Sequence, residues 1–145
     1  MLRDIHEGGK PKKKQAKKWT DGRKFKSHKL DMLFRSNWEI ELAEHLHSLG
    51  IDFVYEPERF YYRAERESYL PDFFLPQWNV FIEVKGYMDK RSLKRVKLFR
   101  KYQLNEYGFM LYEKDERELV LSGQICIKTL LEIAREEHER VKAES

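Results

Sequence analysis

The sequence predicts an α/β fold, with one central β-sheet flanked by helices on both faces. Short segments with alternating or continuous apolar residues are separated by longer segments whose apolar residues recur at helical spacing. The chain has 145 residues, of which 41% are hydrophobic. That length and composition allow one domain with one core.

The first predicted helix spans residues 36–49. Ser36 and Glu39 fit the S-x-x-E capping box at its start, and Gly50 fits the glycine that ends a helix. Its predicted buried stripe consists of Trp38, Leu42, Leu46 and Leu49.

Predicted strands and helices alternate along the rest of the chain. The predicted strands are 51–56, 60–62, 69–75, 79–85 and 107–112, with 118–121 as an additional candidate. The predicted helices are 90–104 and 124–141. The strands 69–75 and 79–85 are joined by Pro76-Gln77-Trp78, which predicts a tight hairpin.

The net charge of +4 conceals a basic amino-terminal arm. Residues 1–35 contain 12 of the 29 Lys and Arg residues but only 4 of the 25 acidic residues. We therefore predict a flexible, DNA-binding arm over 1–30 and a folded domain over 31–145. A tail that only increases solubility is the alternative interpretation. The predicted DNA contacts in the arm are Lys12, Lys13, Lys14, Lys17 and Lys18.

The sequence shows no membrane or secretory segment. No apolar run approaches the roughly 20 residues that span a bilayer, and the amino terminus lacks a signal-like apolar stretch. Cys126 is the only cysteine, which excludes an intramolecular disulfide and a cysteine-based zinc site. We expect a soluble, cytoplasmic protein with no membrane partner.

The predicted hairpin brings three charged residues together. If it is centred between Gln77 and Trp78, Asp72 lies opposite Glu83, and directly opposed Cβ atoms are about 4.5–5.5 Å apart. Lys85 points to the same face because it is two residues beyond Glu83. The opposite face is apolar and suits the core; it consists of Phe73, Leu75, Val80, Ile82 and Val84.

Two interpretations of this cluster are open. It can be a cross-strand salt bridge in which Lys85 neutralises both acids. That interpretation leaves two like charges directly opposite each other, which is destabilising. A divalent cation would remove the repulsion, and a few hard oxygen ligands suit Mg²⁺, with Mn²⁺ expected to substitute.

Glu39 is a further candidate ligand. It groups with Leu42 and Leu46 on the helix, whereas Glu41 and Glu44 lie on the opposite face. Its alternative role is to cap the helix with Ser36.

These residues match a known pattern. The chain resembles the PD-(D/E)xK nuclease superfamily, and within it the phage endonuclease I family of Holliday-junction resolvases. The matching segments are Phe34-Arg35-Ser36 with Trp38-Glu39, Gly50-Ile51-Asp52-Phe53 with Tyr55-Glu56, Pro71-Asp72-Phe73, Phe74-Leu75-Pro76, and Phe81-Ile82-Glu83-Val84-Lys85-Gly86.

The resemblance implies a restriction-endonuclease-like core with a mixed sheet and a magnesium-dependent DNA endonuclease that cleaves branched DNA. It implies Glu39, Asp72 and Glu83 as metal ligands and Lys85 as the catalytic lysine, and we add a backbone carbonyl near Val84. One departure is Val54, where family members can carry a glutamate; Glu56 points to the same side and is a possible substitute. Paired cuts on a junction would need two active sites, so we expect a homodimer.

The predicted helix 90–104 is strongly basic, and one face carries Lys90, Lys94, Lys97 and Lys101, with Arg91 and Arg95 beside it. We predict DNA contacts by Arg35, Lys90, Arg91 and Lys94, against the alternative of a merely solvated surface. Two other functions compete with a junction-cleaving enzyme. One is a homing, nicking or transposition endonuclease of the same fold that acts on a DNA sequence, and the other is a basic DNA-binding module without catalysis.

Overall fold

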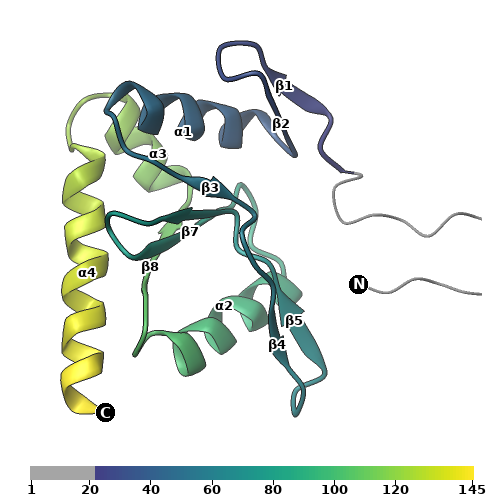
Figure 1. The fold of residues 1–145 in the computed structure, drawn as a ribbon, viewed down its shortest axis with the longest axis vertical. Helices are drawn as coiled ribbons and strands as arrows, with labels where there is room; N and C mark the ends of the chain where they lie inside the picture. The colour runs from purple at the N-terminus through teal and green to yellow at the C-terminus, as the bar shows by residue number, and fades with distance from the viewer. Residues whose placement is uncertain (1–21) are drawn as a thin grey trace, which may run out of the picture. The chain divides into compact units, whose positions relative to one another are not determined.

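A computed structural model describes residues 22–145, which divide into two compact units, one that ends at Glu44 and one that begins at His45. The strands are β1 (Phe25–Ser27), β2 (Met32–Phe34), β3 (Val54–Tyr55), β4 (Phe60–Tyr62), β5 (Glu67–Tyr69), β6 (Phe73–Leu75), β7 (Val80–Val84) and β8 (Gly108–Tyr112). The helices are α1 (Asn37–Ser48), α2 (Lys90–Gln103), α3 (Lys114–Leu121) and α4 (Ile127–Glu144) (Figure 1).

In the first unit, β1 and β2 form an antiparallel hairpin that the sequence did not predict. Ser27, at the end of β1, donates a hydrogen bond from Oγ to Glu44 Oε2 at 2.8 Å. The hairpin begins inside the segment predicted to be a flexible arm. The predicted contacts Lys12, Lys13, Lys14, Lys17 and Lys18 lie outside the described residues.

Helix α1 begins and ends within one residue of its predicted bounds. The predicted cap at its start is present, because Glu39 N donates to Ser36 Oγ at 3.2 Å. The Glu39 carboxylate accepts a hydrogen bond from Arg35 N at 3.1 Å, so it also satisfies a backbone donor at the helix start.

In the second unit, four strands form a mixed sheet in the order β3-β6-β7-β8. The pairs β3–β6 and β6–β7 are antiparallel, whereas β7–β8 is parallel. This sheet, together with the helices, confirms the predicted α/β class and its mixed central sheet. Strands β4 and β5 form a separate antiparallel hairpin.

The segment 69–75 was predicted as one strand and is divided in the structure. Tyr69 ends β5 and Phe73 begins β6, so the two halves belong to different sheets. Pro71 lies between them and has no N–H to donate to a strand ladder, which accounts for the break.

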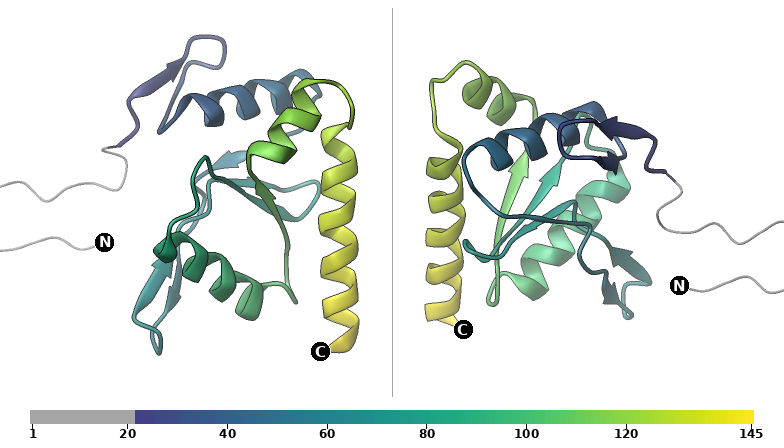
Figure 2. Two further views of the ribbon diagram at one scale, coloured as in Figure 1. Left: turned by 180° about the vertical axis from the view of Figure 1, so that it is seen from behind. Right: turned by 45° about the horizontal axis from the view of Figure 1, so that its top comes forward.

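Both faces of the four-stranded sheet are covered by helices, as predicted. On one face, Phe81 and Phe109 pack with Phe99 of α2, at ring-centroid distances of 5.4 and 5.0 Å. On the other face, α4 approaches β8 closely at Gly108, where an added Cβ would lie 3.1 Å from the Ala134 carbonyl oxygen. Figure 2 shows α2 and α4 on opposite sides of β8.

The additional strand predicted at 118–121 is wrong, because these residues belong to helix α3. The helix begins with a capping box in which Glu113, an unusual cap residue, takes the place of serine or threonine, and Glu113 N donates to Glu116 Oε1 at 3.0 Å. The final helix starts at Ile127 rather than at residue 124, after Gly123 with a φ of 80°. Among the residues that the structure describes, no helix is both long and apolar enough to cross a membrane.

Candidate active site

The register of β6 and β7 places the two predicted acids side by side. Phe73 pairs with Ile82, Phe74 with Phe81, and Leu75 with Val80, which is the predicted register. Continued by one residue, this pairing brings Asp72 opposite Glu83. The predicted apolar face is also confirmed, since its five residues are all buried: Phe73, Leu75, Val80, Ile82 and Val84.

Asp72 is buried and is held by the backbone of the neighbouring strand. Its Oδ2 atom accepts a hydrogen bond from Val84 N at 2.7 Å. A backbone N–H is a rigid donor, so this bond limits the rotation of the carboxylate. The side chain therefore has a defined position against β7.

Glu83 is buried as well, and its Oε1 atom accepts a hydrogen bond from the hydroxyl of Tyr69 at 2.6 Å. Burial raises the pKa of Tyr69 well above its usual value of 10, and the charges of Glu83 and Asp72 raise it further. The phenol therefore stays protonated and acts as the donor. Tyr69 was not identified as a site residue from the sequence, because no local pattern predicts that its hydroxyl contacts Glu83.

Glu56 directly follows β3 and is bonded through its backbone to Asp72. In the β3–β6 register Val54 pairs with Phe74 and Tyr55 with Phe73, so the next pair is Glu56 and Asp72. Glu56 N donates to the Asp72 carbonyl at 2.8 Å, and the residue is buried with a φ of 49°. A non-glycine residue in this left-handed region carries backbone strain.

Lys85 directly follows β7 and is partly exposed. Its backbone N donates to the Tyr112 carbonyl at 3.0 Å, which extends the β7–β8 ladder to this residue. The pKa of Asp89 is lowered mainly by hydrogen bonds from Ser92, and the charge of Lys85 lowers it further. Asp89 caps the start of α2, so the lysine lies near the beginning of the basic helix.

Glu39 belongs to the first unit, and its participation in the site stays a prediction. Within residues 22–145, no three His, Cys, Asp or Glu side chains form a group that could hold a metal ion. The donor set of Asp72 and Glu83 still fits Mg²⁺, because this ion is commonly bound by one or two carboxylates, with waters and substrate phosphate completing its shell.

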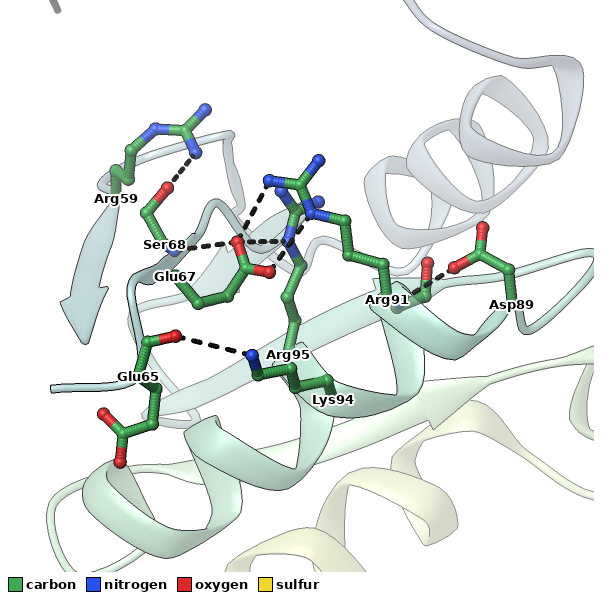
Figure 3. Close-up of polar contacts among 9 residues, drawn as sticks. Arg59, Glu65, Glu67, Ser68, Asp89, Arg91, Lys94 and Arg95 are labelled. Carbon is green, nitrogen blue, oxygen red and sulfur yellow. Dashed lines mark hydrogen bonds and ion pairs between the residues drawn. The ribbon is translucent and has the colours of Figure 1, made fainter. Parts of the chain in front are cut away.

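The predicted DNA contacts on α2 differ in their surroundings. Arg91 forms two hydrogen bonds with the Glu67 carboxylate, both 3.1 Å long, and Arg95 Nε donates to the same carboxylate at 3.3 Å. Lys94 Nζ donates to the Glu65 carbonyl at 3.4 Å, whereas Lys90 is exposed. Figure 3 shows both guanidinium groups directed at the Glu67 carboxylate.

Comparison of the chain with family models, curated proteins and solved structures finds no match.

Proposed function

We propose that the chain is a magnesium-dependent DNA endonuclease of the PD-(D/E)xK type that hydrolyses phosphodiester bonds. The observation that supports it most is the placement of Asp72 and Glu83 at adjacent register positions, both buried, with Lys85 two residues beyond Glu83. This is the spacing on which the resemblance to the superfamily rests.

Asp72, Glu83 and the carbonyl of Val84 would hold the ion, with Glu39 as a further ligand. When bound, Mg²⁺ would polarise the phosphate and lower the pKa of an attacking water. Val84 N and the Tyr69 hydroxyl each hold one carboxylate oxygen, so both acids are oriented before any ligand arrives. Such preorganisation reduces the reorganisation needed during the reaction.

Lys85 contributes a positive charge on the same side of the hairpin. Its ammonium group would orient or activate the attacking water and offset the negative charge that develops on the phosphorane. Helix α2 contains seven Lys and Arg residues and no acid, and it begins five residues after Lys85. Its exposed cations, with the amino-terminal arm, would bind the phosphates that flank the cleaved bond.

The preference for branched DNA and the homodimer rest on the resemblance. Incubation with a synthetic four-way junction, a flap and a matched linear duplex, each with and without Mg²⁺, tests both the activity and the substrate. We expect cleavage of the junction only when Mg²⁺ is present. Equal cleavage of the linear duplex would favour a sequence-directed endonuclease of the same fold.

The charge of α2 also supports a second candidate, a DNA-binding module without catalysis. This candidate predicts binding to all three substrates and no product at any Mg²⁺ or Mn²⁺ concentration. Product formation by the wild-type protein that is lost in Glu83→Gln would exclude it.

A further inference from the structure

Tyr69 lies where the aromatic core meets the two acids. It is the last residue of β5 and is 3% exposed. Its ring packs edge-on against Phe99 of α2, with centroids 5.9 Å apart. The ring is therefore fixed by the core of the second unit, while its hydroxyl contacts Glu83.

The Tyr69 hydroxyl is bonded to one of the two acids that are proposed to bind the metal ion. The Tyr69 hydroxyl donates to a carboxylate that lies opposite a second acid on the neighbouring strand. A protonated phenol can donate only one hydrogen bond, and the Tyr69 hydroxyl donates it to Glu83 Oε1. This bond restricts rotation of the carboxylate and so determines the direction of its second oxygen.

We propose that Tyr69 is a positioning residue that holds the Glu83 carboxylate in the orientation that binds a divalent cation. The proposal rests on the metal-dependent function proposed above and deepens it. Groups that orient a metal ligand commonly change metal affinity by about 10- to 100-fold when they are removed.

A second buried tyrosine offers a matched control. Tyr62 is the last residue of β4, is 4% exposed, and donates its hydroxyl to Gln103 Oε1 at 2.5 Å. Tyr62→Phe and Tyr69→Phe therefore each remove one hydroxyl and one hydrogen bond from a buried ring, but only Tyr69→Phe removes a contact with Glu83.

The experiment is calorimetric titration of Mn²⁺ into the full-length wild type and both variants, without DNA. We expect Tyr69→Phe to bind Mn²⁺ about 10-fold or more weakly than the wild type, and Tyr62→Phe to bind it like the wild type. Circular dichroism checks that both variants are folded. Wild-type affinity in folded Tyr69→Phe, or an equal loss in Tyr62→Phe, would overturn the positioning role alone.

The proposed function fails separately if the wild type neither binds Mn²⁺ nor cleaves DNA, and the positioning role then falls with it. If Tyr69→Phe does not fold, the near-ultraviolet difference spectrum of the wild type on adding saturating Mg²⁺ decides the question. We expect the addition of Mg²⁺ to change the tyrosine absorption of the wild type, and to change that of Tyr62→Phe in the same way. A spectrum without any tyrosine change would overturn the proposal.

Discussion

Asp72 and Glu83 are 9% and 8% exposed, which is unusual for two acids at adjacent positions of a sheet. Removing a carboxylate from water is costly unless it is hydrogen-bonded, and a second like charge nearby adds to the cost. Val84 N and the Tyr69 hydroxyl offset part of it. A bound cation would offset the remaining repulsion, and the burial of the pair therefore supports the proposed function.

We predict that Asp72→Asn, Glu83→Gln and Lys85→Ala each abolish cleavage and leave junction binding near the wild-type level. The asparagine and glutamine oxygens can still accept the bonds from Val84 N and Tyr69, so the main change is the loss of charge. Cleavage assays and gel-shift titrations measure the two properties, with Lys128→Ala on α4 as an exposed control. Unfolding of these variants, seen by circular dichroism, would instead support a structural salt bridge.

Glu39→Gln should reduce activity by orders of magnitude with little loss of stability. Glutamine keeps an oxygen that can accept from Arg35 N, so the helix start stays satisfied while the charge is lost. Glu41→Gln should stay active. Glu44 is a poorer control because it accepts a bond from Ser27. If both variants retain activity, the further acid must be sought elsewhere, beginning with Glu56.

At the scale of elements, the β4–β5 hairpin is joined to α2 by a charged cluster around Glu67 (Figure 3). The Glu67 side chain is 6% exposed and forms ion pairs with Arg91 and Arg95. Tyr69 lies two residues along the same strand, so Glu67 and Tyr69 share one face of β5. One strand therefore contacts both the basic helix and the acid pair.

This cluster predicts a pH-dependent stability. The hydrogen bond from Arg91 is the main cause that lowers the pKa of Glu67, from 4.5 to about 2, with smaller contributions from Ser68 N and Arg95. The stabilisation is fully present above pH 4.5 and is lost as the pH falls from 4.5 towards 2. Glu67→Gln should lower the free energy of unfolding at pH 7 by about 1–2 kcal/mol.

Urea unfolding of the wild type and Glu67→Gln at pH 7, 4 and 2.5 measures this difference, with the exposed Glu118→Gln as a control. The difference should shrink at the lowest pH, which lies well below the unfolded pKa of 4.5 and close to the folded pKa of about 2. A difference that does not change with pH would show that the ion pairs do not stabilise the fold.

For the whole molecule, positive charge is distributed between the amino-terminal arm and α2. Residues 1–35 carry a net charge of +8, and the remaining residues a net charge of −4. Within that acidic remainder, α2 is a local basic surface without acidic residues. Two separate regions of the chain therefore carry the positive charge that the proposed DNA binding requires, and their contributions can be measured separately.

Deleting residues 1–18 should weaken DNA binding at moderate salt and reduce the slope of log affinity against log salt by several units. Each phosphate contact contributes about 0.9 to that slope on duplex DNA. The cleavage rate at saturating protein should change little, because the acids of the site remain. Fluorescence-anisotropy titrations at several salt concentrations measure the slope. An unchanged slope would show that α2 carries the electrostatics and that the arm is a solubilising tail.

Much of the second unit could be predicted from the sequence. The burial of Phe73, Leu75, Val80, Ile82 and Val84 was predicted from their shared face of the hairpin, and the short connection between the strands predicted the register. These two local features are sufficient to place Asp72 beside Glu83. The cap of helix α1 and the buried positions Leu42 and Leu46 were also predicted correctly, whereas Leu49, predicted as part of the buried stripe, is 38% exposed because it lies beyond the end of the helix.

Only the tertiary structure decided which residues support the acids. Tyr69 and Glu83 are 14 positions apart, and Glu67 and Arg91 are 24 apart. No helical or strand periodicity links residues at such separations. Their contacts depend on how the separate β4–β5 hairpin and α2 pack together around Phe99, which no local sequence pattern predicts.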